Sequence, residues 1–112
     1  MNANEHLKEH TCSDNYFKHY FGTVFTDGVK ALCDKFSCYW FLDVVTSYQP
    51  KLRSAEFQVW KLTKNNGSTA IVTCEDGNGQ SLIQQKIPFT DFEPQEATIW
   101  MENGVILLPS EH

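Results

Sequence analysis

Residues 56–87 decide the fold of this chain, and they read EFQVWKLTKNNGSTAIVTCEDGNGQSLIQQKI. Apolar, aromatic and β-branched side chains alternate with polar ones, and loops rich in Asn and Gly interrupt the alternation at residues 65–68 and 76–79. Such loops tolerate positive φ angles and reverse the chain between antiparallel strands. The stretch therefore predicts three strands joined by two hairpin turns, at residues 56–63, 69–75 and 80–87.

The same strand pattern continues toward the C-terminus. Residues 97–102 and 105–108 each predict a strand, and Asn103-Gly104 between them is the pair that type I′ hairpins prefer. Residues 88–96 form a connection that is too long for a tight hairpin. We therefore expect a roughly five-stranded antiparallel meander sheet whose apolar face needs a covering layer.

Two helical patterns precede the strands. Residues 13–22 place aromatic side chains at positions i, i+1, i+4 and i+5, and Gly22 suits the position that follows a helix. Thr26 and Asp27 form a second start signal, because a threonine side chain accepts an unpaired N–H and an aspartate complements the helix dipole. Apolar side chains then recur at helical spacing, at Val29, Leu32, Cys33 and Phe36.

Residues 38–48 are apolar nearly all round, which is expected of a segment buried on most sides. We favour a helix that ends before Pro50, because a proline disfavours the α conformation of the residue before it. A buried strand is the alternative, because the segment is rich in aromatic and β-branched residues. The predicted fold class is α+β, with N-terminal helices packed on a roughly five-stranded antiparallel meander sheet.

Length and composition bound the classes of protein that remain. The chain has 112 residues, the length of one domain, with 41% hydrophobic residues and a net charge of −5. This acidic balance argues against nucleic-acid binding through a basic face. The polar residues 1–13 predict a flexible N-terminal segment, and residues 14–112 predict a single α+β domain. We expect a cytoplasmic protein without a membrane span, with free cysteines and no cofactor.

Several strings of residues carry a resemblance to a known family. Among them are Thr26-Asp-Gly-Val-Lys30, Cys38-Tyr-Trp-Phe-Leu-Asp43, Phe57-Gln-Val-Trp-Lys-Leu62, Ile87-Pro-Phe-Thr-Asp-Phe92 and Asn103-Gly-Val-Ile-Leu-Leu-Pro-Ser-Glu111. From about Tyr16 to the C-terminus the chain resembles an uncharacterised family of short, single-domain bacterial proteins that also occurs on phages and plasmids. The resemblance implies a bacterial or mobile-element setting. The family has no assigned activity, so the resemblance implies no site residue.

Asp43 is the most informative polar residue, because apolar side chains flank it in a segment that we expect to be buried. A buried carboxylate needs a partner, or its pKa rises. In a structural role, Asp43 would bind backbone N–H groups or pair with His19, Lys30 or Arg53. In a functional role it would act as an acid or base beside a pocket, and the candidate catalytic residues would be Asp43, Ser47, Gln49 and His19.

Two tryptophans are candidate binding residues. Trp60 and Trp100 are expected to point away from the inner face of the sheet, because their neighbours in the alternation supply apolar side chains to that face. Two exposed tryptophans on one sheet face would mark a protein-binding surface or a dimer interface. In the alternative interpretation, a second helical layer or the N-terminal segment covers them.

The sequence contains one candidate metal pattern, at His6, His10 and Cys12. The two histidines would lie one turn apart on a helix, and the cysteine would complete three ligands. A solvated polar segment is the alternative, and it is the one we favour. Residues 76–87 begin like a calcium loop but carry Ser81 and Ile87 where such a loop needs glycine and glutamate.

These observations favour a small non-enzymatic protein that binds a protein partner or a second copy of itself. The sequence contains neither a phosphate-binding glycine loop nor the nucleophile-elbow motif of hydrolases. One alternative is a small hydrolase or ligand-binding enzyme with a pocket around Asp43. A second alternative is a metal-binding protein that uses His6, His10 and Cys12.

Overall fold

The computed structural model describes residues 16–19, 23–52, 55–65, 68–90 and 95–111. Within these residues the chain forms seven strands, two α-helices and two short 3-10 helices. In chain order they are β1 (Tyr16–Lys18), β2 (Val24–Thr26), α2 (Asp27–Phe36), α3 (Tyr39–Ser47), η2 (Gln49–Lys51), β3 (Phe57–Lys64), β4 (Ala70–Glu75), β5 (Ser81–Ile87), β6 (Glu96–Glu102), β7 (Val105–Leu107) and η3 (Pro109–Glu111).

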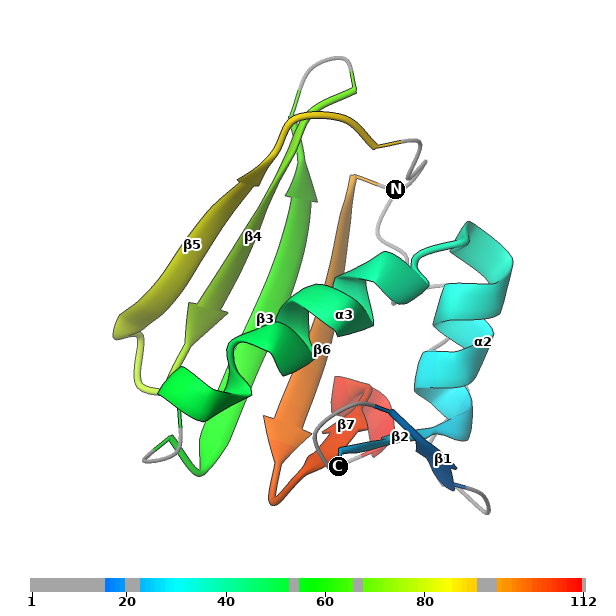
Figure 1. Cartoon of the computed structure of the whole chain (residues 1–112), viewed down its shortest axis with the longest axis vertical. Coiled ribbons are helices and arrows are strands. Elements are labelled where there is room, and N and C mark those ends of the chain that lie inside the picture. Colours follow the sequence, from blue (N-terminus) through cyan, green and yellow to red (C-terminus); the bar gives the residue numbers. More distant parts are fainter. Residues whose placement is uncertain (1–15, 20–22, 53–54, 66–67, 91–94, 112) are drawn as a thin grey trace.

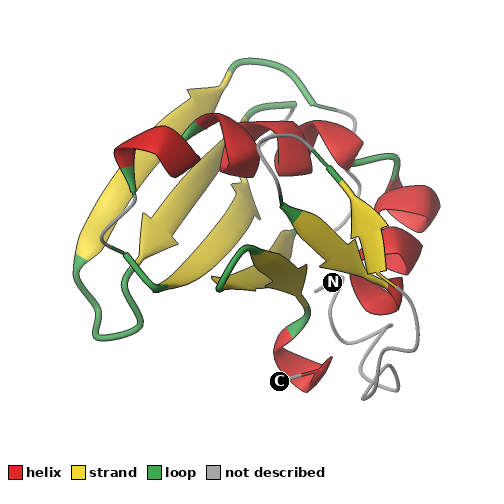
Figure 2. Cartoon of the chain, turned by 60° about the horizontal axis from the view of Figure 1, so that its bottom comes forward, coloured by secondary structure: helices red, strands yellow, loops and turns green. Residues whose placement is uncertain are grey.

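The strands form one mixed sheet in the order β1-β2-β7-β6-β3-β4-β5. The pair β2–β7 is parallel, and the other neighbouring strands are antiparallel. Helix α3 runs across β3 and β6 in Figure 1, and α2 contacts β1, β2 and β7. In Figure 2 both helices lie on the same side of the sheet. The protein is therefore α+β, with its core between the two helices and one face of the sheet.

The N-terminal part of the sheet corrects the predicted helix at residues 13–22. Tyr16–Lys18 is strand β1, and Phe17 lies opposite Phe25 of β2 with the ring centroids 5.5 Å apart. Aromatic residues suit both a helix face and a strand, so their spacing in a short segment does not distinguish the two. The remainder of the predicted helix, residues 13–15 and 20–22, lies outside the described residues, as does the predicted N-terminal segment 1–13.

The five predicted strands are present within one or two residues of their predicted bounds, but they do not form a meander. Strand β6 pairs with β3 along its whole length and not with β5, which precedes it in the chain. The long connection after Ile87 allows this, because it is free to return from the end of the sheet to its centre. The three-residue strands β1 and β2 extend the sheet beyond β7, and the parallel pair β2–β7 makes it mixed.

Both helices that follow Thr26 were predicted. Thr26 caps α2, since its side chain accepts a hydrogen bond from Val29 N at 3.4 Å, and Ser37 ends the helix in the left-handed conformation. The segment 38–48 contains helix α3, Tyr39–Ser47, as we favoured, but this helix is buried on one side only. Its buried residues recur at helical spacing, at Phe41, Leu42, Val45 and Thr46.

The C-terminal end of the chain is fastened to the beginning of α2. The Glu111 carboxylate accepts hydrogen bonds from Thr26 Oγ1 at 2.6 Å and Leu108 N at 2.9 Å through Oε1, and from Gly28 N at 3.2 Å through Oε2. A carboxylate is favourable there because the first turn of a helix has unpaired N–H groups and a partial positive charge. A Cβ on Gly28 would lie 2.6 Å from Glu111 Oε1, so glycine permits this close approach.

Candidate functional site

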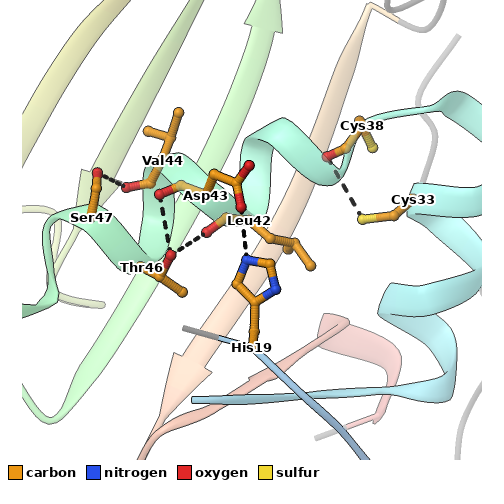
Figure 3. A network of polar contacts seen from close by, with 8 residues as sticks. All are labelled: His19, Cys33, Cys38, Leu42, Asp43, Val44, Thr46 and Ser47. Atoms are coloured by element: carbon orange, nitrogen blue, oxygen red, sulfur yellow. Dashed lines mark hydrogen bonds and ion pairs between the residues drawn. The ribbon is translucent and has the colours of Figure 1, made fainter. Parts of the chain in front are cut away.

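The structure brings two of the four candidate catalytic residues together. His19, which follows β1, places Nε2 2.9 Å from Oδ1 of Asp43 on α3, as Figure 3 shows. The Asp43 side chain is 55% exposed and that of His19 only 14%. The expected burial of Asp43 is therefore wrong, because the apolar neighbours of Asp43 in the sequence project from the other sides of α3. Among the described residues, His19 is the structural partner that Asp43 contacts. Arg53, another partner we considered, lies outside the described residues.

The hydroxyl and amide groups at the end of α3 make other contacts. Ser47 Oγ donates to the carbonyl of Val44 at 2.7 Å, and Gln49 Nε2 donates to the carbonyl of Val45 at 2.9 Å. Such bonds to the preceding turn are common for these side chains near helix ends. The His19–Asp43 pair can orient an imidazole for proton transfer. The Ser47 hydroxyl does not join that pair, since its proton is directed to the backbone (Figure 3).

A buried amide cluster, which sequence reasoning missed, lies where η2 meets β3. Gln49 and Gln58 exchange two hydrogen bonds of 2.9 Å, and Gln58 Oε1 also accepts from Trp60 Nε1 at 2.8 Å. Gln58 Nε2 further donates to the carbonyl of Ala55 at 3.2 Å, so both ends of this side chain are engaged. The alternation of β3 puts Gln58 on the same face as Trp60, two residues later, but it does not tell that this face is buried, so the sequence alone could not reveal the cluster.

The two tryptophans do not share a face of the sheet, which corrects the predicted binding surface. Trp60 lies opposite Ile99 and is completely buried on the side of the helices. Trp100 lies opposite Val59 on the other side, where its ring centroid is 5.2 Å from that of Phe57. Opposite residues of antiparallel strands project to the same face, so this register separates the two indoles. Alternation alone did not determine which of the two sets of alternate side chains in β3 faces the helices.

Three of the four cysteines fall within the described residues, and all three are buried thiols as predicted: Cys33, Cys38 and Cys74. A hydrogen bond with Cys38, and then burial, raise the pKa of the Cys33 thiol. Burial raises the pKa of Cys74 to about 12, and the nearby acidic residues add to this effect. A raised pKa suppresses the reactive thiolate, so these cysteines behave as apolar core residues.

The proposed metal ligands His6, His10 and Cys12 lie outside the described residues. Within the described part of the chain, His, Cys, Asp and Glu do not gather into a group of three that could hold a metal ion. Among the same residues, neither helix is long and apolar enough to cross a membrane.

The two edges of the described sheet differ in length and character. One edge is β1, of three residues, and the other is β5, of seven. Strand β5 carries a single charge, Lys86, and no proline. Two residues beyond it, Phe89 is 75% exposed, the largest exposure among the large apolar side chains described. The sequence predicted the strand but not its edge position, because that position depends on where β6 inserts.

A cavity of about 320 Å³ opens where β4 begins and β5 ends. Its lining is mainly apolar and includes Ala70, Ile71, Ile87 and Pro88, with Lys86 at its side. Lys86, Ile87 and Pro88, at the end of β5 and just beyond it, thus line the cavity, and the exposed Phe89 is the next residue in the chain. We call this region, Ser81–Ile87 together with Pro88 and Phe89, the β5 edge.

Comparison with known proteins identifies the family of the chain and no relative of known function. No curated protein and no solved structure matches it. The whole chain, residues 1–112, matches one family of unknown function, which confirms the resemblance seen in the sequence. The chain therefore belongs to DUF6876, a family of unknown function.

Proposed function

We propose that this protein is a non-enzymatic binding module that adds an extended segment of protein chain to its sheet along the β5 edge. The observation that carries the proposal is the position of β5, a seven-residue strand at the end of the described sheet. The outer side of an edge strand offers backbone N–H and C=O groups at the spacing of a ladder. Addition of a strand to such an edge is a common way in which proteins bind extended segments.

The surroundings of β5 support the same proposal. In strand addition the backbone ladder supplies affinity, and hollows for alternate side chains supply specificity. A mainly apolar cavity adjoins the β5 edge, lined by Ile71 of β4 with Ile87 and Pro88, and Phe89 is a large exposed apolar side chain. Natural proteins commonly protect long edges with several charges or an internal proline. Strand β5 has only Lys86.

The enzyme alternative around Asp43 has one supporting observation, the contact with His19. Hydrolysis also needs a nucleophile or a held water beside the histidine. Ser47 and Gln49, the other candidates, direct their side chains to backbone carbonyls of α3. More than half of the Asp43 side chain is exposed to water. These contacts suit a surface ion pair, and we therefore place binding above catalysis.

Site-specific photocrosslinking tests the proposed function. A photoreactive phenylalanine analogue is introduced at Gln84, which is exposed in β5, or at Lys35, an exposed matched position on α2. The two full-length variants are irradiated in cells that naturally produce the protein, and adducts are identified by mass spectrometry. We expect a discrete protein adduct from position 84 and none from position 35. No adduct from position 84, or equal yields from both positions, would contradict the proposal.

A further inference from the structure

We infer that the segment added at the β5 edge is β5 of a second copy of this chain, in an antiparallel pair centred on Gln85. This inference rests on the proposed function, because it names the occupant of the same edge. It follows from the residue pattern of β5 and its register on β4.

The regular part of β5 is its last five residues. The register between β4 and β5 shifts between Cys74 and Glu75, so that Cys74 lies opposite Ile83 and Glu75 opposite Ser81. Leu82 is the extra residue at this bulge. From Ile83 to Ile87 the pairing with β4 is uninterrupted, and this five-residue stretch is the part of the edge that can accept a further strand in regular register.

This stretch, Ile83-Gln84-Gln85-Lys86-Ile87, has nearly the same pattern in both directions. Two copies related by a twofold axis place a strand against its own reverse, so they require a self-complementary pattern. With Gln85 on the axis, Ile83 lies opposite Ile87 of the second copy, and this contact occurs twice. A neutral pair of amides occupies the axis itself.

The faces of the sheet agree with this register. Ile83, Gln85 and Ile87 lie opposite Cys74, Val72 and Ala70, which are buried on the side of the helices. Opposite residues of antiparallel strands project to the same face, so the paired isoleucines of both copies stay on the helix side. A shift by one residue would turn every side chain to the wrong face.

A register centred on Gln84 would also keep each side chain on its face of the sheet, but it would not pair apolar residues with apolar residues. It would place Ile83 opposite Gln85, and Ile87 opposite Ser81, of the second copy. The Gln85-centred register instead pairs apolar with apolar residues and sets Lys86 opposite Gln84, so no two like charges lie directly opposite each other. Continued beyond the strand, it places Phe89 opposite Ser81 of the second copy. Phe89, 75% exposed in one copy, thereby gains a neighbour.

The test measures molar mass in solution across a dilution series of the full-length chain, with substitutions at Gln84. Gln84 is exposed and has no bond to α3, unlike Gln85, whose Oε1 accepts from Tyr48 Oη at 2.6 Å. In the inferred dimer, Gln84→Glu creates two opposite-charge pairs with Lys86, and Gln84→Lys creates two like-charge pairs. Thr63, exposed on β3, provides matched controls with the same charge changes, Thr63→Glu and Thr63→Lys.

We expect a dimer whose dissociation constant falls about two- to ten-fold in Gln84→Glu and rises by a similar factor in Gln84→Lys, with the Thr63 variants unchanged. The double variant Gln84→Lys/Lys86→Glu restores opposite-charge pairs, so it should dimerise more tightly than Gln84→Lys alone. Weakening by both single charges at position 84 would overturn the register, because a Gln84-centred dimer opposes that residue to itself. Equal effects at positions 84 and 63 would overturn the interface.

If the chain is a monomer at every concentration measured, the inference that a second copy occupies the β5 edge is wrong. The proposed function is judged separately by the photocrosslinking experiment, because an adduct of position 84 with a different protein would retain strand addition at this edge. Failure of the dimer and failure of the binding edge are therefore distinguishable.

Discussion

The amide cluster of Gln49, Gln58 and Trp60 and the ion pair of His19 and Asp43 both join the α3 region to another part of the chain. The amide cluster joins η2 to β3 and includes the fully buried Trp60. The ion pair joins the segment after β1 to α3, and its aspartate is mostly exposed. Their distances are nearly equal, at 2.8–2.9 Å.

The two clusters differ in their exposure to water. A buried polar group that loses its partner meets no water and costs its full desolvation free energy, whereas an exposed group returns to water. We therefore expect the buried amides to stabilise the fold more than the contact of His19 with the exposed Asp43 does. For this chain, burial and not formal charge is the guide to which polar contacts hold the structure together.

Replacement of Gln58 should have the largest effect. Gln58→Ala removes the acceptor of Trp60 Nε1 and both bonds to Gln49. It leaves Trp60 Nε1 unpaired in the core and takes away the donor to the half-buried Gln49 Oε1, whereas Gln49 Nε2 keeps its bond to the carbonyl of Val45. At about 1–3 kcal/mol for each unsatisfied buried group, we expect a loss of about 2–4 kcal/mol in the free energy of unfolding. Urea unfolding followed by tryptophan fluorescence measures this loss.

The matched control for Gln58 is Gln80→Ala, since Gln80 is an exposed glutamine in the turn before β5. We expect this substitution to change stability by no more than about 0.5 kcal/mol. If the two variants lose similar amounts, the buried cluster is no more stabilising than a surface amide, and the contrast with the ion pair disappears.

The contact of Glu111 with α2 is an intermediate case, because it joins a charged group to a partly buried helix end. Glu111→Ala removes an acceptor from Thr26 Oγ1, Gly28 N and Leu108 N. We expect a loss of about 1–3 kcal/mol, between the effects of the amide cluster and the ion pair. Thermal unfolding of the single variant tests the magnitude.

A double-mutant cycle with Gly28 tests the geometry of that contact. An alanine Cβ at Gly28 would meet the Glu111 carboxylate at 2.6 Å and Leu108 Cδ1 at 2.8 Å. Gly28→Ala should therefore cost less in the Glu111→Ala background than in the wild type, because one of the two clashes is gone. Strict additivity of the two substitutions would show that the carboxylate does not occupy this position.

The local pattern of the sequence was sufficient to predict most of the strands and helices, but not the order of the strands in the sheet. Alternation and the turns at 65–68, 76–79 and 103–104 specify β3–β7, because those signals act between adjacent residues. The pairing of β2 with β7 joins residues about 80 positions apart through two three-residue strands. No local signal marks such a pair, and the edge position of β5 follows from the same long-range arrangement.

The candidate site shows the same limit at the level of single side chains. His19 was among the partners expected for Asp43, because an aspartate near apolar residues needs a cation or donors. The exposure of Asp43 was not predicted, since apolar content does not tell which side of a helix faces the core. The opposite faces of Trp60 and Trp100 follow from the register of β3 on β6, which alternation within one strand does not determine.

Removal of the contact between His19 and Asp43 should have a small effect on stability. With 55% of the Asp43 side chain exposed, Asp43→Asn should lower the free energy of unfolding by about 0.2–1 kcal/mol, and less at high salt. Urea unfolding at low and high ionic strength measures both. A loss above about 2 kcal/mol, insensitive to salt, would contradict this expectation and place the pair in the same class as the buried amides.

The smallest effects are expected at the exposed cluster of Lys30, Asp34 and Tyr39, where Asp34 accepts from both neighbours at 2.6 Å. The hydrogen bond from Lys30, and then that from Tyr39, hold the pKa of Asp34 below its usual value. The resulting stability is present above the unfolded pKa of about 4 and is lost as the pH falls through the lower folded pKa. Asp34→Asn should therefore flatten the acid side of the stability profile.

Tyr39 should act on the alkaline side of the same profile. Burial, and then the bond to Asp34, raise the pKa of Tyr39 to about 12. The folded state retains this proton between the unfolded pKa of about 10 and the folded value, so stability falls as the pH rises through that interval. Tyr39→Phe should reduce that fall, and the buried thiols Cys33 and Cys74, whose pKa values are also raised, contribute to the part that remains. Urea midpoints from pH 9 to 12 test this, and an unchanged slope in Tyr39→Phe would show that even this tyrosine contact is fully screened by water.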